Sequence, residues 1–349
     1  MKIRKPSVKQ MAVFNICAII ILIFLWYLVR PLRIPELWTA PGNIVSIDPL
    51  IDAKPIRKES RHITTNLYMT YVKETEVNSR WEKFTLGIEG FEKRAVLQSY
   101  ASAANGDFTE RDLNALGKAL IPYMKHDIIK AAMVHENIDW PEQISKPIVI
   151  FHPEKFKTGR DLQVGDEVVA LNGAEIDSAD DINLLLKDKK VGDTVIVKVI
   201  RNQHKQEVPV TIKELDMRGK ATLGVYMKNR FTFDGLSEDD VVSLDDSYSG
   251  ESGGFILALG LIQQLEPNID FSKGRKIAGT GAISRGGDIQ PIGNLDLKVL
   301  TASRENADLF FYPKFQEDQV TTAVKKYNIH NIELVGVRNL NEAISYLTN

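Results

Sequence analysis

The chain contains the motif Ser249-Gly250-Glu251-Ser252-Gly253-Gly254-Phe255, which opens an apolar stretch typical of a buried helix. The glycines let the backbone approach a substrate closely, and a helix that begins here points free amide N–H groups at Ser252. Those amides are candidates for an oxyanion hole, with Gly250, Glu251 and Gly253 as supporting residues. A serine that only caps the helix shows the same pattern, so both interpretations stay open on this motif alone.

A second motif, Pro291-Ile292-Gly293-Asn294-Leu295-Asp296-Leu297-Lys298-Val299, supplies a candidate base in Lys298. To act as a base, a lysine amine must be neutral, which requires its pKa to fall from ~10.4 to near ~7.5. Apolar neighbours such as Ile292, Leu295 and Val299 would favour the neutral form if they surround the amine. A neutral lysine beside a serine is sufficient for peptide-bond hydrolysis. The alternative is a lysine on the solvated face of an amphipathic helix.

Other chemistries fit the residue types less well. The six histidines lack the close spacing of a zinc-binding helix motif, so we expect no metal site. A Ser-His-Asp triad stays open by sequence order, although His330 is the only histidine after residue 216. No G-x-x-x-x-G-K-[ST] loop occurs, and Gly279-Thr280-Gly281 lacks the third glycine of a dinucleotide loop. We therefore expect neither ATP nor another cofactor.

The amino-terminal region predicts a membrane anchor. Residues 11–29 read MAVFNICAIIILIFLWYLV, 19 residues that as a helix span ~28 Å, close to the hydrocarbon thickness of a bilayer. Four basic residues precede this span, which favours an amino terminus in the cytoplasm. A cleaved signal peptide is the alternative, but no clear Ala-x-Ala site follows. We expect a single-pass protein of the cell membrane with an extracellular body.

Composition bounds the rest of the chain. With 349 residues and 44% hydrophobic content, the chain is able to fill two or three ordinary cores. The net charge is −2, and the first 30 residues carry five basic and no acidic side chains, so the body is mildly acidic. This balance argues against nucleic acid as the main partner. The single cysteine, Cys17, excludes disulfides within the chain.

The chain beyond the anchor divides into three regions by pattern. Residues 31–145 hold a proline-rich tether over 31–49, strands over 43–47 and 63–72, and a helical pattern over 91–136 with Thr109 as a candidate cap. Residues 146–215 are rich in strands, expected over 148–151, 194–201 and 208–212, with a tight turn at Asn172-Gly173 and a helix capped near Ser178.

Residues 216–349 alternate the two element types, which predicts a mixed α/β domain. Strands are expected over 222–226, 276–283, 309–312 and 332–335, and helices over 253–265, 295–306, 316–327 and 340–347.

This last region resembles the proteolytic domain of Lon-type serine peptidases. Four segments follow the order of that family: Gly279-Thr280-Gly281-Ala282-Ile283, Ile289-Gln290-Pro291-Ile292-Gly293, Lys298 and Phe310-Phe311-Tyr312-Pro313. The resemblance implies that Ser252 is the nucleophile, that Lys298 is its base, and that Thr280 hydrogen-bonds the lysine amine. The family usually has proline at Glu251, alanine at Gly253 and glycine at Asn294, so the shape of the oxyanion hole stays open.

The middle region resembles a PDZ domain through Leu162-x-x-Gly165-Asp166-x-Val168 and Asn172-Gly173. The whole order resembles bacterial membrane-anchored peptidases of the YlbL and SepM type. The resemblance implies an α+β chain with a cytoplasmic tail and transmembrane helix (1–30), a tether with strands and helices that pack on the protease (31–145), a PDZ domain (146–215) and a Lon-like proteolytic domain (216–349). No clear carboxylate-binding loop precedes Ile148.

These observations predict an ATP-independent serine endopeptidase with a Ser-Lys dyad. The expected substrates are secreted or unstructured peptides, such as signalling peptides, cleaved at the outer face of the membrane. A PDZ domain ordinarily binds an extended peptide by strand addition. Expected partners are therefore peptide or unfolded protein and the membrane, and a homo-oligomer is compatible with the sequence. A catalytically silent PDZ adaptor is the alternative, and the unusual Glu251 keeps it open.

Overall fold

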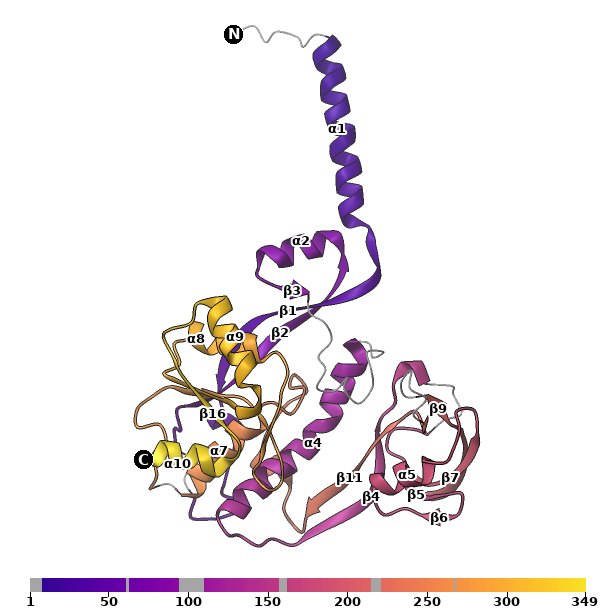
Figure 1. The fold of residues 1–349 in the computed structure, drawn as a ribbon, viewed down its shortest axis with the longest axis vertical. Coiled ribbons are helices and arrows are strands. Elements are labelled where there is room, and N and C mark those ends of the chain that lie inside the picture. Colours follow the sequence, from indigo (N-terminus) through magenta and orange to yellow (C-terminus); the bar gives the residue numbers. More distant parts are fainter. Residues whose placement is uncertain (1–7, 61–62, 94–109, 157–161, 215–220, 267) are drawn as a thin grey trace. The chain divides into compact units, whose positions relative to one another are not determined.

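The computed structural model describes residues 8–60, 63–93, 110–156, 162–214, 221–266 and 268–349. The chain divides into two compact units, one of Met1–Pro41 with Lys73–Ala95 and one of Gly42–Val72 with Val96–Asn349. Its elements are helices and both parallel and antiparallel strands, so the α+β class expected from the sequence is confirmed (Figure 1).

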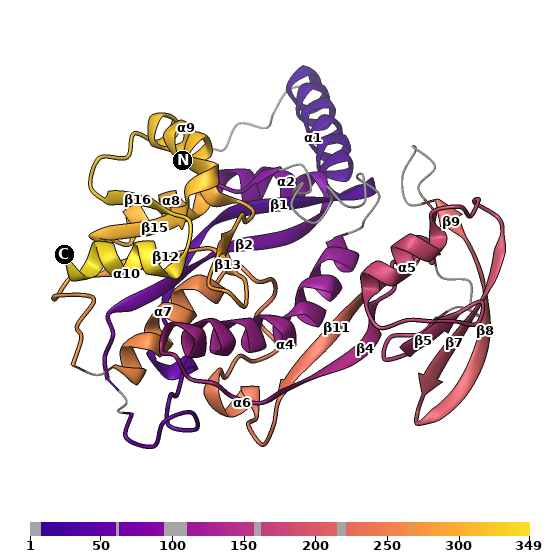
Figure 2. The same cartoon turned by 60° about the horizontal axis from the view of Figure 1, so that its bottom comes forward.

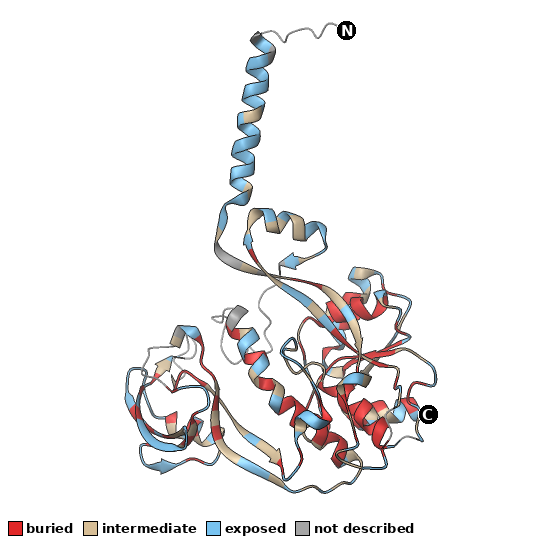
Figure 3. Cartoon of the chain, turned by 180° about the vertical axis from the view of Figure 1, so that it is seen from behind, coloured by how far each residue is buried: buried red, intermediate tan, exposed pale blue. Residues whose placement is uncertain are grey.

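The first unit begins with the helix α1 (Val8–Val29), whose segment Met11–Val29 has a mean hydropathy of 2.7. Among the described residues, α1 is the one helix long and apolar enough to cross a membrane. A helix of this kind at an amino terminus serves as an anchor or as a signal sequence. Its side chains are largely exposed (Figure 3). The unit also holds α2 (Arg80–Ile88) and the short strand β3 (Glu92–Lys93).

The expected tether over 31–49 is a strand for most of its length, which corrects the sequence interpretation. This strand, β1 (Pro31–Ser46), lies between β2 (Leu67–Ser79) and β3 in the sheet. Among the described residues, β3 pairs with Trp38 and Thr39 of β1. Because the rest of that edge has no ladder within the described residues, the prolines of β1 leave few hydrogen bonds unmade.

A six-stranded mixed sheet has the strand order β16-β15-β12-β2-β1-β3. The strand β12 (Ile277–Gly279) runs parallel to β2 on one side and to β15 (Leu309–Pro313) on the other, and β16 (Glu333–Val337) runs parallel to β15. The expected strand over 276–283 is broken after Gly279, because the Gly281 amide leaves the ladder and donates to the Ser252 carbonyl.

Helices cover both faces of this sheet. The helices α4 (Glu110–His135), α7 (Gly254–Leu265) and α10 (Leu340–Thr348) share one core with Ile277 and Phe311. The helices α8 (Leu295–Arg304) and α9 (Glu317–Tyr327) share another with Ala278 and Phe310. Successive strand residues point to opposite faces, so neighbouring positions of β12 and β15 enter different cores. Figure 2 shows α7 and α4 side by side.

A second sheet is antiparallel, in the order β11-β4-β5-β7-β8. Its strands are β4 (Glu142–Phe151), β5 (Glu167–Leu171), β7 (Thr194–Arg201), β8 (His204–Thr211) and β11 (Tyr226–Phe233), with β6 (Ala174–Glu175) paired to β5. The expected turn is confirmed, since Asn172 and Gly173 both have positive φ. The helix α5 (Ala179–Leu186) begins at a capping box of Ser178 and Asp181, as expected.

Short elements complete the chain: η1 (Asp48–Leu50), η2 (Glu154–Phe156), η3 (Lys314–Gln316), α6 (Glu238–Val241), β9 (Lys213–Glu214), β10 (Ala221–Thr222), β13 (Ala282–Ile283) and β14 (Ile289–Gln290). The expected strand over 222–226 is wrong: β10 ends at Thr222 and β11 begins at Tyr226, because Gly224 adopts a φ of +79°. Thr109, the candidate cap of α4, lies outside the described residues. The helices expected over 253–265, 295–306, 316–327 and 340–347 are confirmed to within two residues at each end.

Candidate active site

Ser252 lies in the turn that leads into α7, and the core fixes the position of this turn. Every residue of α7 from Gly254 to Leu265 is buried. The cap position of the helix is Gly253, which makes no side-chain cap hydrogen bond. The Ser252 hydroxyl instead accepts a hydrogen bond from Lys298 Nζ at 2.6 Å. The serine side chain therefore contacts the candidate base rather than capping the helix.

Lys298 projects from the first turn and a half of α8, and the residue is only 4% exposed. Its sequence neighbours Leu295 and Val299 belong to the apolar core between α8 and the sheet. The structure therefore contradicts the interpretation of Lys298 as a solvated surface lysine. Burial of an amine disfavours its charged form, since the ammonium loses its hydration.

Thr280 connects the turn around Ser252 (residues 249–253, the serine turn) to Lys298. Its residue is fully buried, and its Oγ1 donates to the carbonyl oxygen of Ser252 at 3.0 Å. The same Oγ1 accepts from Lys298 Nζ at 3.2 Å. The Gly281 amide donates to the same Ser252 carbonyl at 2.8 Å. One buried threonine thus fixes both the backbone of Ser252 and the amine of Lys298.

The backbone amides around Ser252 differ in their availability. The Gly250 amide donates to the Gly117 carbonyl at 3.2 Å, and the Gly254 amide donates to the Glu251 carbonyl at 3.1 Å. The amides of Ser252 and Gly253 have no acceptor among the described residues. A substrate oxyanion would therefore find its donors at Ser252 and Gly253 rather than at Gly250.

Glu251, the residue that departs most from the Lon-type pattern, contacts a lysine of the antiparallel sheet. Lys228 Nζ of β11 lies 3.7 Å from Glu251 Oε1, and it lies over the ring of Tyr123 at 4.9 Å from the centroid. Burial raises the pKa of the Tyr123 hydroxyl, an effect that Arg230 partly offsets, so the phenol is neutral at physiological pH. The contact with Lys228 therefore links the serine turn to β11.

The structure accounts for two other departures from that pattern. A Cβ at Gly253 would lie 3.2 Å from Met69 Sδ, which leaves little room for the alanine usual in the family. Asn294 adopts a φ of 51° at the start of α8, a left-handed conformation that glycine and asparagine tolerate best. Asparagine therefore occupies the position of the glycine in the Lon-type pattern at little conformational cost.

Sequence reasoning missed two residues that position this site. A Cβ at Gly117, on α4, would lie 2.3 Å from Ser249 Oγ and 3.0 Å from the Gly250 nitrogen, so the serine turn packs directly on the helix backbone. The buried Gln316 side chain accepts from the Ile292 amide at 2.9 Å and donates to the Ile292 carbonyl at 2.8 Å. Neither residue carries a sequence signal, because both act through contacts with distant parts of the chain.

The antiparallel sheet presents an unpaired edge beside a helix. The strand β11 is the last in the sheet order, so one of its edges has no strand partner among the described residues. The helix α5 contacts β11. Directly before β11, Leu223 and Val225 are buried around Gly224, which has positive φ. This Leu-Gly-Val turn follows β4, β5, β7 and β8 in sequence and leads directly into β11.

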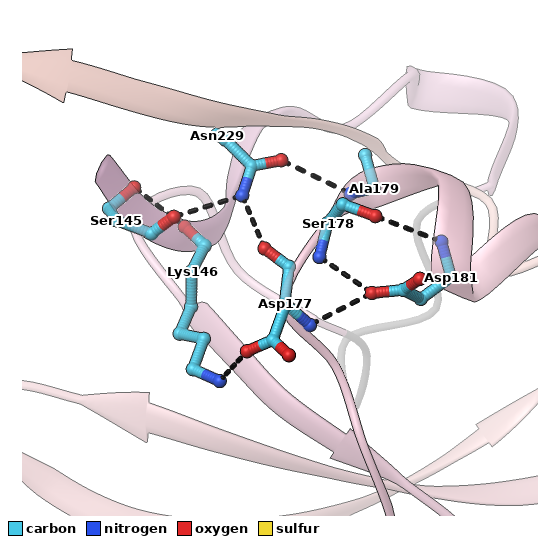
Figure 4. Close-up of polar contacts among 7 residues, drawn as sticks. All are labelled: Ser145, Lys146, Asp177, Ser178, Ala179, Asp181 and Asn229. Carbon is cyan, nitrogen blue, oxygen red and sulfur yellow. Dashed lines mark hydrogen bonds and ion pairs between the residues drawn. The ribbon is translucent and has the colours of Figure 1, made fainter.

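Asn229 ties β11 to the amino terminus of α5 (Figure 4). Its Nδ2 donates to the carbonyls of Asp177 at 2.7 Å and Ser145 at 2.9 Å, and its Oδ1 accepts from the Ala179 amide at 3.2 Å. Asp177 also pairs with Lys146 of β4. These contacts fix the start of α5 against β11 and β4.

Among the residues that the structure describes, no group of three or more His, Cys, Asp or Glu side chains is placed to hold a metal ion.

One family model matches the region of the antiparallel sheet. Residues 142–212 match the family model described as PDZ domain, a region that runs from β4 to the end of β8. In sequence, the chain is 25% identical over 138 residues to the Archaeal Lon protease of Halobacterium salinarum, covering 38% of this chain and 19% of that protein. It is 36% identical over 52 residues to Protease Do-like 1, chloroplastic, of Arabidopsis thaliana, covering 15% of this chain and 12% of that protein. The chain thus spans less than a fifth of either relative.

Two solved bacterial structures are also similar to part of this chain. The PDZ domain of an SdrC-like protein from Listeria monocytogenes is 19% identical, covers 24% of this chain and 87% of its own length, and has a TM-score of 0.23. A protein from Geobacillus thermodenitrificans is 27% identical, covers 23% of this chain and 95% of its own length, and has a TM-score of 0.20.

Proposed function

We propose that this chain is a membrane-anchored, ATP-independent serine endopeptidase with Ser252 as nucleophile and Lys298 as base. One observation carries the proposal: Lys298 Nζ lies 2.6 Å from Ser252 Oγ and belongs to a residue only 4% exposed. A buried amine in hydrogen-bond contact with a hydroxyl places a general base next to the nucleophile, one of the arrangements that activate a serine. The sequence likeness to two proteins named as proteases supports the same reaction class.

In the first step, Ser252 Oγ attacks the carbonyl carbon of the scissile peptide bond while Lys298 Nζ takes the hydroxyl proton. The amides of Ser252 and Gly253 hold the resulting oxyanion. The intermediate then collapses, and Lys298 returns the proton to the nitrogen of the leaving amine. The products of this step are a free amine and an ester between the substrate acyl group and Ser252.

In the second step, water attacks the ester carbonyl while Lys298 takes a proton from the water. Collapse of the second intermediate breaks the bond to Oγ, and Lys298 returns the proton to Ser252. Thr280 keeps the amine within reach throughout, because its Oγ1 lies 3.2 Å from Lys298 Nζ. The second product is a carboxylate, and the enzyme returns to its starting state.

The substrate class follows from two features. The sequence carries no P-loop, so the chain has no visible means of unfolding a protein with ATP, and short or unstructured peptides are the substrates we propose. The free edge of β11 supports peptide capture by strand addition, the binding mode typical of PDZ domains. With α1 as an anchor, the substrates are secreted peptides, such as signalling peptides, at the outer face of the membrane.

The test uses the full chain in lipid nanodiscs with a library of unstructured peptides, read by mass spectrometry. We expect cleavage by the parent chain and loss of cleavage in Ser252→Ala and in Lys298→Met, a substitution of similar length without charge. Cleavage that survives both substitutions would contradict the dyad. Binding of peptides without cleavage by the parent chain would instead identify a PDZ adaptor.

A further inference from the structure

The helix α2 carries an exposed apolar face that neither the PDZ domain nor the proposed dyad uses. Trp81 is 47% exposed, Phe84 58% and Ile88 73%. At ~100° per residue, these three positions fall within ~60° of arc on the helix. The rings of Trp81 and Phe84 lie 6.0 Å apart, so the side chains form one continuous patch. Contiguous exposed apolar surface of this kind marks an interaction site.

The opposite face of α2 is fixed to its own unit. Lys83 Nζ lies 2.6 Å from Glu36 Oε1 on β1, and Glu36 Oε2 in turn accepts from Trp38 Nε1 at 3.2 Å. A Cβ at Gly87 would lie 3.8 Å from the Trp38 ring, so the helix packs on that ring one turn after Lys83. The apolar patch therefore faces away from β1.

The start of α2 is set by a capping box. Ser79 Oγ accepts from the Glu82 amide at 3.2 Å, and Glu82 Oε2 accepts from the Ser79 amide at 3.2 Å and from the Asn78 amide at 2.6 Å. A helix as short as Arg80–Ile88 is marginal in water and depends on packing of its apolar face. Within the part of the chain that the structure describes, no residue covers that face.

The contacts between α2 and α1 indicate what the partner is. The Arg80 guanidinium lies over the ring of Tyr27 at 4.3 Å from the centroid, and Arg30 lies over the ring of Trp26 at 4.4 Å. Both rings belong to the last turn of the apolar span Met11–Val29, where amphipathic aromatic side chains favour the membrane surface. The first turn of α2 therefore lies at the level where the span ends (Figure 1).

We infer that α2 is an interfacial helix that inserts Trp81, Phe84 and Ile88 into the outer surface of the same bilayer that α1 spans. The partner is the lipid acyl region just below the headgroups, the depth at which amphipathic helices of this kind bind. This inference rests on the anchor role proposed for α1. The first unit thus contacts the membrane at two places, through the span Met11–Val29 and through the patch of Trp81, Phe84 and Ile88.

The test measures membrane depth by spin labelling of the full chain in lipid nanodiscs. The native Cys17 lies within the span and reports the depth of α1. On a Cys17→Ser background, single labels are placed by Phe84→Cys and Ile88→Cys on the patch. Glu89→Cys, next in sequence and exposed, and Lys189→Cys, exposed in the antiparallel-sheet region, are the matched controls.

We expect labels at 84 and 88 to show a several-fold higher ratio of oxygen to nickel-complex accessibility than labels at 89 and 189. Equal ratios at 84, 88 and 189 would overturn the inference while a deep Cys17 label leaves the anchor intact. A water-accessible Cys17 label would contradict the anchor itself and the inference with it. Spin–spin broadening at 84 between copies, with no lipid depth, would identify a second chain as the occupant and overturn the inference as well.

Discussion

Lys228 Nζ lies 3.7 Å from Glu251 Oε1, so a lysine on the edge strand of the PDZ-containing sheet contacts the residue directly before Ser252. The Lys228 side chain is 43% exposed and that of Glu251 is 21% exposed. An ion pair this open to water contributes little to stability, typically ~0–1 kcal/mol. The contact instead restricts the position of Glu251, the one charged side chain in the motif Ser249–Phe255.

We predict that Lys228→Met lowers the rate of peptide cleavage several-fold without changing the free energy of unfolding by more than ~1 kcal/mol. Glu251→Gln should produce a similar loss, and the double variant should lose no more than either single variant, since both remove the same contact. Lys198→Met, an exposed lysine on β7, is the control and should cleave normally. If the double variant instead loses the sum of the two single-variant losses in cleavage rate, the Lys228–Glu251 contact plays no part in catalysis.

Thr280→Val removes one hydroxyl from a fully buried residue while it keeps the side-chain shape. The variant loses the bond to the Ser252 carbonyl and leaves the Lys298 amine with one partner fewer. Hydrogen bonds to charged or strongly polar groups are worth ~1.5–3 kcal/mol, so we expect kcat to fall by ~10- to 100-fold. Thr280→Ser, which keeps the hydroxyl, should restore most of the rate. If Thr280→Val and the parent chain have equal kcat values, the positioning role of the Thr280 hydroxyl is contradicted.

Gly117→Ala should separate activity from stability. Alanine is favoured over glycine inside a helix by ~1 kcal/mol. The added Cβ would lie 3.0 Å from the Gly250 nitrogen, closer than ordinary packing allows, so the serine turn must shift. We expect a clear loss of kcat with a melting temperature close to that of the parent chain, because the displaced turn offsets the helix gain. A variant with unchanged kcat would show that the turn tolerates the displacement.

Asn229→Ala should weaken peptide capture. It leaves the carbonyls of Asp177 and Ser145 without the amide donor that holds the start of α5 beside β11. We expect a several-fold rise in the Kd of a library peptide, measured by fluorescence anisotropy on the Ser252→Ala background so that no peptide is consumed. Asn202→Ala, in the β7–β8 turn, is the control. An unchanged Kd would place peptide capture away from β11 and α5.

The sequence predicted the parts of the fold that local patterns specify. The apolar segment of α7, the capping box at Ser178 and the Asn172-Gly173 turn are all local, and the structure has each where it was expected. The strand β1 was interpreted as a tether because its prolines argue against a central strand, and only the pairing with β2 and β3 shows that its edge is nearly free.

The sequence was sufficient to predict the central residues of the candidate site, but not the residues that position them. Ser252, Thr280 and Lys298 lie in motifs of recognisable order, and the structure brings all three within hydrogen-bond distance. Gly117 and Gln316 act on the site from α4 and η3, and no local pattern in the sequence shows which distant backbone they contact. The Lys228 contact likewise depends on how β11 pairs with β4, which is a long-range property.

The most direct test of the account is covalent labelling of the nucleophile. The full chain in nanodiscs is treated with a peptidyl β-lactone, an electrophile that acylates an activated serine, and the adduct is located by mass spectrometry. We predict one acyl group on Ser252 Oγ, formed at least ~10³-fold more slowly in Lys298→Met, because a serine without its base loses catalytic rate on this scale or more. Acylation of a different residue, or labelling of Ser252 at the same rate in Lys298→Met, would contradict the Ser252 and Lys298 dyad.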